Sequence, residues 1–321
     1  MRRLLLSAVL LPALIGAAAA QNAPFSFIAW GDMPYAPDDG PKVDRLIAAM
    51  NAAKPAFTIH VGDIKSGSSS CADESLKKAF DQINSVEAPT VYSIGDNEWT
   101  DCHRERAGRF DPRERLAKVR ELAFAKPGTT LGKTPMQVES QAVVMAPKFA
   151  KFVENQRFVK NGVMFVVPHI PGSNNGLEAA DPKSAEEFFE RNPANLAWIA
   201  DSFKVAKETG LKAVVIAFQA NPYDIRQVET AMPRASGFVA TVSAIAKGAR
   251  DLGRPVLVIH GDYHVFEMSN FMDTDMKPVP NTLRLQLFGE ARAHAVKILV
   301  DPDSPGVFGF VPLIVPQNGA F

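Results

Sequence analysis

Three stretches of the chain decide its fold, because each repeats one pattern. They read FSFIAWGD at 25–32, FTIHVGD at 57–63 and TVYSIGDNE at 90–98. In each, a short apolar run ends at Gly-Asp, which is typical of a strand buried on both faces that stops at a turn. A fourth stretch, VLVIHGDYH at 256–264, has the same form near the other end of the chain. The repetition predicts strands whose ends carry acidic side chains.

Helical patterns separate these strands. Gly40-Pro41 begins one helix, whose apolar face recurs at helical spacing up to Met50, and a second spans about 76–83. A charged helix is predicted over 111–121. A further helix is predicted to begin at Pro193, with Asn192 as its N-cap, and to end before Gly210; another covers about 238–249.

The remaining apolar stretches predict more strands, at 163–167, 213–218, 283–287, 296–300 and 307–311. No repeat or linker interrupts the alternation of strands and helices. We therefore expect an α/β fold in a single domain over 21–321, with an irregular insert at about 100–160.

The composition excludes several classes of protein. With 46% hydrophobic and 22% charged residues, the chain is close to the globular average. Its 35 basic residues balance its 35 acidic ones, and no long basic run marks a nucleic-acid surface. We expect no nucleic-acid partner.

Residues 1–20 have the pattern of a signal peptide. Arg2 and Arg3 precede an apolar run, and Ala18-Ala19-Ala20 resembles a cleavage site. Without Arg2 and Arg3, 33 basic residues would face 35 acidic ones, a net charge of −2. No later stretch approaches about 18 uninterrupted apolar residues, so no membrane span is expected after cleavage. The pattern predicts a periplasmic or secreted protein.

The chain contains two cysteines, Cys71 and Cys102, both in the predicted exported part. In an oxidising compartment an isolated pair most simply forms one disulfide. We therefore expect a Cys71–Cys102 bond between the loops that follow the second and third strands.

The chemistry is expected at the strand ends, where ligands bind in open α/β sheets. Asp32, Asp63, Asp96, Gln219, Asp262 and His264 follow five different strands. One Gly-Asp after a strand is ordinary turn chemistry, but four converging carboxylates would repel each other and raise their pKa values. A bound cation would relieve that repulsion.

The order of these motifs resembles that of the calcineurin-like metallophosphoesterases, which include the purple acid phosphatases. The family's motifs are Asp-x-His, Gly-Asp, Gly-Asn-His-Asp/Glu, an isolated His and Gly-His-x-His. This chain has, in the same order, Asp32-Met33-Pro34, Gly62-Asp63, Gly95-Asp96-Asn97-Glu98, Gln219 and Gly261-Asp262-Tyr263-His264. The resemblance implies a four-layer α/β/β/α sandwich and hydrolysis of a phosphate ester by metal-activated water.

The resemblance also implies a ligand set for one or two divalent metals. Asp63 would bridge them, Asp32 and His264 would hold the first, and the second would take Asp96, Asp262 and Gln219. Because Pro34, Asp96, Gln219 and Asp262 replace other residues of the family's motifs, the set is rich in oxygen. Oxygen donors favour Mn²⁺, Mg²⁺ or Ca²⁺ over Zn²⁺.

Asn97 takes the catalytic position of the histidine that protonates the leaving group. His103 is the candidate substitute as general acid, and Arg104 and Glu98 are candidates for holding the substrate. A solvated loop is the alternative for His103 and Arg104. Two functions remain open: an exported phosphoesterase acting on a small-molecule phosphate ester, or a catalytically degenerate binding protein with the same fold.

Overall fold

The computed structural model describes residues 22–36, 38–178, 182–223 and 236–319. Two mixed sheets face each other. The first has the order β12-β11-β1-β2-β3 and the second β4-β5-β6-β7-β8-β10-β9. The strands of the first sheet are β1 (Phe25–Trp30), β2 (Thr58–His60), β3 (Thr90–Tyr92), β11 (Ala295–Val300) and β12 (Phe308–Leu313). Those of the second are β4 (Glu139–Ser140), β5 (Gln156–Lys160), β6 (Val163–Val167), β7 (Ala213–Ala217), β8 (Val256–His260), β9 (Glu267–Ser269) and β10 (Thr282–Gln286).

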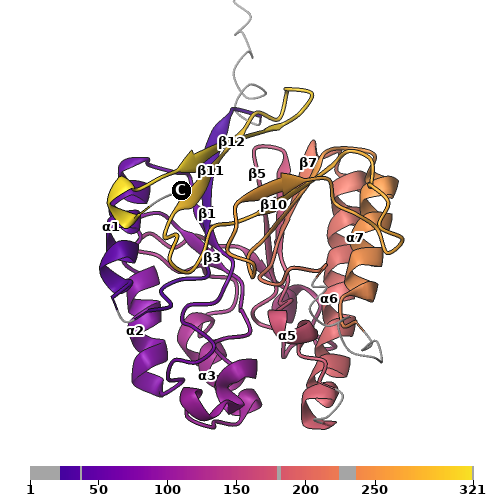
Figure 1. Ribbon diagram of the computed structural model, residues 1–321. Coiled ribbons are helices and arrows are strands. Elements are labelled where there is room, and N and C mark those ends of the chain that lie inside the picture. Colours follow the sequence, from indigo (N-terminus) through magenta and orange to yellow (C-terminus); the bar gives the residue numbers. More distant parts are fainter. Residues whose placement is uncertain (1–21, 37, 179–181, 224–235, 320–321) are drawn as a thin grey trace, which may run out of the picture.

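Helices cover the outer face of each sheet (Figure 1). The described helices are α1 (Gly40–Ala52), α2 (Asp73–Ile83), α3 (Pro112–Ala123), α4 (Gln141–Val144), α5 (Gly172–Asn175), α6 (Pro182–Glu208) and α7 (Val239–Leu252). Helices α1 and α2 lie on one side of the molecule and α6 and α7 on the other. The predicted α/β/β/α sandwich is confirmed.

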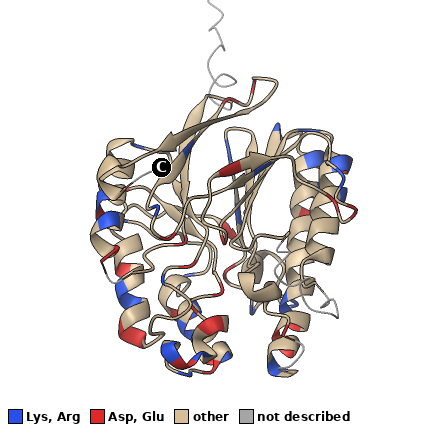
Figure 2. Cartoon of the chain, viewed as in Figure 1, with Lys and Arg blue, Asp and Glu red and all other residues tan. Residues whose placement is uncertain are grey.

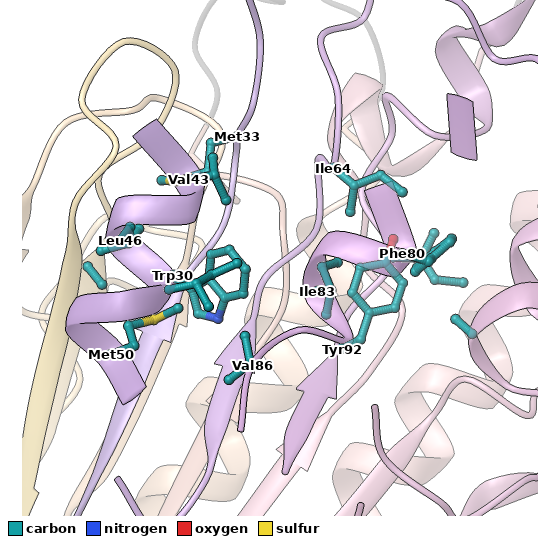
Figure 3. Packing of buried hydrophobic residues seen from close by; sticks show 14 of the residues in the cluster. Trp30, Met33, Val43, Leu46, Met50, Ile64, Phe80, Ile83, Val86 and Tyr92 are labelled. Atoms are coloured by element: carbon teal, nitrogen blue, oxygen red, sulfur yellow. The ribbon is translucent and has the colours of Figure 1, made fainter. Parts of the chain in front are cut away.

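Three apolar layers hold the four structural layers together. The first lies under α1, α2 and α3, where Trp30 of β1 and Phe80 of α2 are buried (Figure 3). The second fills the space between the sheets, where the rings of Phe27 and Phe165 meet edge to face at 5.2 Å. The third packs α6 and α7 against the second sheet around Trp198. Because both faces of the central strands are buried, these strands read as continuous apolar runs.

Parallel pairing gives several strands a common direction. In the first sheet β1, β2 and β3 are parallel, and in the second β6, β7, β8 and β10 are parallel. Strand β11 is antiparallel to β1, with Val300 opposite Phe25. The carboxyl end of β11 therefore lies at the edge opposite to Asp32.

The prediction of a helix starting at Pro193 is wrong. Helix α6 begins at Pro182 and carries Pro193 in its interior. The turns before Pro193 are fixed by Arg191, whose wholly buried guanidinium donates to the side chain of Glu187 and to the backbone oxygens of His169 and Asn175. This anchor is polar, so the apolar periodicity could not reveal it.

The predicted disulfide is confirmed. Cys71 and Cys102 are bonded, with their Cα atoms 5.7 Å apart and both side chains fully buried. The bond ties the loop after β2 to the 3₁₀ turn Thr100–His103 after β3. The predicted signal peptide lies outside the described residues. Among the helices that the structure does describe, none is long and apolar enough to cross a membrane.

Candidate active site

The six predicted metal ligands lie at strand ends of both sheets. They are Asp32 after β1, Asp63 after β2, Asp96 after β3, Gln219 after β7, and Asp262 and His264 after β8. The first four are at most 7% exposed, and the last two are half-buried. Figure 2 shows charged residues mainly on the helices and loops, and few on the central strands.

Four of these residues have left-handed backbones. The φ angles are 53° at Asp32, 56° at Asp63, 79° at Asp262 and 60° at His264. This region costs a residue with a Cβ atom about 1–2 kcal/mol. Strained backbones of this kind concentrate at functional sites, where the surrounding structure holds them in place.

Asp63 is the centre of a hydrogen-bond network that joins the two sheets. Its Oδ2 atom accepts from the Tyr35 hydroxyl at 2.6 Å, the Asn97 amide at 2.7 Å and the Gln219 amide at 3.3 Å. Its Oδ1 atom accepts from the backbone N–H of Asn97 at 3.1 Å. Asn97 also donates to the Tyr35 hydroxyl at 2.8 Å. The amide of Asn97 is therefore engaged with Asp63 and Tyr35.

Asp32 and His264 form a second group. Nε2 of His264 lies 3.6 Å from Oδ1 of Asp32, which also accepts from the backbone N–H of Asp262 at 2.9 Å. The His264 ring meets the Tyr35 ring edge to face, with centroids 4.9 Å apart, and its Nδ1 atom lies 3.4 Å from Glu290. Oδ2 of Asp32 and Nε2 of His264 are buried and have no hydrogen-bond partner.

Ser173 links Asp96 to Asp101. Its hydroxyl donates to Oδ2 of Asp96 at 2.7 Å and lies 3.1 Å from Oδ1 of Asp101. Ser173, Asn174 and Asn175 are consecutive left-handed residues, with φ angles of 47°, 58° and 58°. This turn directs the Ser173 side chain toward the loop that follows β3.

The residue before Ser173 must be small. The N–H of Gly172 donates to Oε1 of Gln219 at 2.5 Å, and a Cβ atom on Gly172 would lie 2.8 Å from Oδ1 of Asp96. Gly172 thus permits the close approach of two of the predicted ligands, Asp96 and Gln219.

Burial and mutual repulsion raise the pKa values of several carboxyl groups in the site. Burial, with repulsion from Asp96, Glu98 and Asp32, raises the pKa of Asp63 well above its usual value. Burial also raises the pKa of Asp32, although His264 opposes the shift. Burial, followed by repulsion from Asp96, raises the pKa of Asp101 to about 8. Crowded buried carboxyls of this kind are typical of active sites and of cation sites.

The donor set accommodates a cation most readily beside Asp32 and His264. Oδ2 of Asp32 and Nε2 of His264 are unsatisfied acceptors when the imidazole is the Nδ1–H tautomer, and a cation would satisfy both. Oxygen and imidazole are suitable ligands for a divalent metal.

The other predicted ligands are already engaged. Oδ2 of Asp63 accepts three hydrogen bonds, Oδ2 of Asp96 accepts from Ser173, and Oδ2 of Asp262 accepts from the backbone N–H of Asn221 at 2.9 Å. Within the described ranges, no group of three or more His, Cys, Asp or Glu side chains is arranged as metal ligands.

The predicted catalytic and substrate-binding residues differ in how deeply they are buried. His103 is exposed, with Nδ1 2.6 Å from the carbonyl oxygen of Thr100, and it lines a cavity of about 340 Å³ together with Arg104, Asp101 and Ser173. Arg104 pairs with Asp101 at 2.5 Å and leaves 48% of its side chain exposed.

Glu98 lies beneath the cluster instead of at its open side. It has no exposed surface, and Oε1 accepts from the Tyr92 hydroxyl at 2.5 Å and from the N–H groups of Gly95 and Asp63 at 2.6 and 3.3 Å. This position lets Glu98 hold the turns that carry Asp63 and Asp96, and leaves it no surface to offer a substrate.

Sequence reasoning did not identify Tyr35, Ser173 or Lys65 as members of the site. Lys65 is 6% exposed, and burial lowers its pKa while Glu98, Asp63 and Asp101 oppose that shift. The sequence did contain a signal for the turn at Ser173, because the Asn174-Asn175 pair that follows it tolerates a left-handed backbone. Tyr35 and Lys65 reach the site through the packing of their loops, which no local pattern reveals.

The two facing sheets, their outer helices and the acidic strand ends form a metallophosphoesterase-type fold. A solved structure described as that of PhoD is similar, with a TM-score of 0.58 and 12% sequence identity, over 91% of this chain and 69% of that one. A purple acid phosphatase, PPD1, from yellow lupin (Lupinus luteus) seeds gives a TM-score of 0.49 and 9% identity, over 93% of this chain and 55% of that one. No protein-family model matches the chain, and no curated protein matches it in sequence. At this identity the likeness to PhoD establishes the fold.

Proposed function

We propose that this chain is an exported, metal-dependent phosphoesterase that hydrolyses a small-molecule phosphate ester. One observation carries the proposal: the left-handed residues Asp32, Asp63, Asp262 and His264 gather at the strand ends, where Oδ2 of Asp32 and Nε2 of His264 are buried without a hydrogen-bond partner. The fold shared with PhoD supports it, and the buried disulfide is compatible with export.

One divalent cation is proposed, held by Asp32 and His264. Mn²⁺, Mg²⁺ or Ca²⁺ is favoured over Zn²⁺ because the surrounding donors are mainly oxygens. When bound, such a cation supplies an activated water and neutralises charge on the phosphoryl oxygens. Asp63 would orient the Tyr35 hydroxyl and the Asn97 amide toward the same space.

Proton transfer to the leaving group is proposed for His103. Asn97 has no titratable proton near neutral pH, whereas His103 is exposed at the cavity that also contains Arg104 and Ser173. Arg104, half of whose side chain is accessible, would bind a phosphoryl oxygen there.

A second function is a phosphoesterase-fold binding protein without catalysis. The observation that favours it is the engagement of Oδ2 of Asp63, which accepts from Tyr35, Asn97 and Gln219 and so offers a bridging metal no free lone pair on that oxygen. Such a protein would retain a ligand or a single cation and release no phosphate.

The test uses protein spanning residues 21–321, purified without chelators. Elemental analysis and calorimetry with Mg²⁺, Mn²⁺, Ca²⁺ and Zn²⁺ measure binding, and chromogenic phosphate mono- and diesters measure hydrolysis. Asp32→Asn should weaken metal binding at least tenfold. The matched control is Asp301→Asn, because Asp301 also follows a strand, β11, but at the opposite edge of the sheet.

Metal-dependent hydrolysis lost in Asp32→Asn and kept in Asp301→Asn would support the enzyme. Metal or ligand binding without hydrolysis of any ester would favour the binding protein. A folded sample that neither binds a cation nor hydrolyses an ester would contradict the first proposal.

A further inference from the structure

A second cavity lies beside the candidate site, between the first turns of α1 and the helix α2. Its volume is about 570 Å³, and its walls come from these two helices and from the loops that follow β1 and β2. Tyr35 and Lys65 of the site described above line this cavity, whereas the six predicted metal ligands do not.

Tyr35 connects the cavity to the acidic cluster. The residue lines the cavity, while its hydroxyl donates to Oδ2 of Asp63 at 2.6 Å. Ile64 and Lys65, which immediately follow Asp63, line the cavity as well. A molecule in the cavity would therefore lie against the same tyrosine that contacts the cluster.

Two lysines give the cavity a positive charge. Lys65 is buried, with only 6% of its surface exposed, and its Nζ atom donates to the backbone oxygen of Ser66 at 2.9 Å. Within the part of the chain that the structure describes, no carboxylate lies within 4.0 Å of the ammonium groups of Lys65 or Lys78. Asp63, Glu98 and Asp101 act on Lys65 only from a greater distance.

Lys65 is the buried one of the two, and an ammonium group is costly to bury without an anionic partner. Lys78 is exposed and bears no such cost. The acidic residue that lines the cavity, Asp44, accepts from the Gln82 amide at 2.7 Å, and Gln82 also donates to the backbone oxygen of Gly40 at 3.1 Å. These bonds join α1 to α2 and leave the two lysines available to a ligand. The charge therefore suits an anionic group.

The rest of the wall is largely apolar. Pro34, Ala36, Pro41, Ile64 and Ala79 line it, and Ile64 belongs to the apolar layer under α1 and α2 (Figure 3). A ring or short hydrocarbon would fit against this surface, with its anionic substituent at the lysines. Cavities of this size and mixed lining are typical of small-molecule sites.

We infer that this cavity binds the alcohol half of the phosphate ester and selects alcohols that carry an anionic group such as a carboxylate. The inference rests on the proposed function, because it places the organic part of the leaving group of that reaction, while the ester oxygen that His103 would protonate stays on the side of Asp63 and outside this cavity. Tyr35 separates the two halves: the phosphate lies on the side of Asp63, and the organic group lies between α1 and α2.

The test compares two esters of the same shape, 4-carboxyphenyl phosphate and its neutral amide, 4-carbamoylphenyl phosphate. The measured quantity is the ratio of their kcat/KM values. Lys78→Met should lower the ratio about fivefold, the size expected for one partly exposed charge pair, and Lys78→Arg should keep it. Lys65→Met should lower it further because Lys65 is buried.

Lys77→Met is the matched control. Lys77 is the neighbouring exposed lysine on α2, but it does not line the cavity and pairs with Asp81 at 2.6 Å. Lys77→Met should leave the ratio unchanged. A ratio that Lys78→Met and Lys65→Met leave within twofold of wild type would overturn the inference.

A binding measurement separates this inference from the proposed function. 4-Carboxyphenylphosphonate and its carbamoyl analogue cannot be hydrolysed at the P–C bond, so calorimetry reports their binding alone. Tighter binding of the carboxylate, lost in Lys78→Met, in a protein that hydrolyses neither ester would support the cavity and contradict the enzyme. Hydrolysis with equal affinity for both phosphonates would support the enzyme and contradict the cavity.

Discussion

The disulfide gives the most quantitative prediction. Cys71 and Cys102 are 31 residues apart, and a crosslink of that span removes about 12 cal/mol/K of entropy from the unfolded chain, or about 3.7 kcal/mol at 25 °C. Unfolding a domain of about 300 residues has an entropy near 2.1 cal/mol/K per residue. The Cys71→Ala/Cys102→Ala variant should therefore melt about 6 °C lower than wild type.

Calorimetry or circular dichroism, with and without a reducing agent, measures this shift. Reduction should lower the melting temperature of wild type by a similar amount and leave the double variant unchanged, which separates the crosslink from any packing loss at the two alanines. Both sulfurs are fully buried, so reduction is carried out in denaturant before refolding. A double variant within 1 °C of wild type would refute the reasoning.

Three further outcomes are expected. Gly172→Ala should lower hydrolysis at least tenfold, since its Cβ would lie 2.8 Å from Asp96, whereas Gly306→Ala, whose Cβ meets nothing within 4 Å, should be neutral. His103→Ala should slow alkyl phosphates by about 10²–10⁴ and activated aryl esters far less, with metal content unchanged; equal losses on both would contradict a general acid. Burial lowers the pKa of His60 to about 3, so His60 should cost stability as the pH falls from 7 to 5, whereas the raised pKa values of Asp63 and Asp101 act in the opposite direction. The unfolded chain protonates His60 below about pH 6.5, at about 1–2 kcal/mol, so urea unfolding should show His60→Asn gaining that much stability relative to wild type between pH 7 and pH 5; an unchanged difference would contradict a neutral, buried His60.

Much of the fold was predictable because its central strands are buried on both faces. The predicted bounds match β1 at 25–30, β6 at 163–167 and β8 at 256–260. Strand β5 was missed because its sequence, QRFVK, begins and ends with polar residues, and its place is fixed by antiparallel pairing with β6. Pairing of this kind depends on the partner strand and leaves no local periodicity.

The positions of the acidic residues in the site were as predictable as the central strands. Strand ends locate Asp32, Asp63, Asp96 and Asp262, since each follows an apolar run directly. Hydrogen-bond partners from distant loops could not be located in this way. Tyr35 and Asn97 donate hydrogen bonds to Asp63 only because the loops after β1 and β3 fold over the end of β2.

The left-handed residues supply a physical argument that these side chains serve function. Glycine would adopt the φ angles at positions 32, 63, 262 and 264 with less strain than Asp or His, although these two residue types tolerate the region better than most. Burial of Asp32 and Asp63 is a further cost, because crowding disfavours their ionised forms. A packing role would be met more stably by glycine and apolar residues, and this comparison supports the proposal that the oxygen and nitrogen atoms at these strand ends bind a cation.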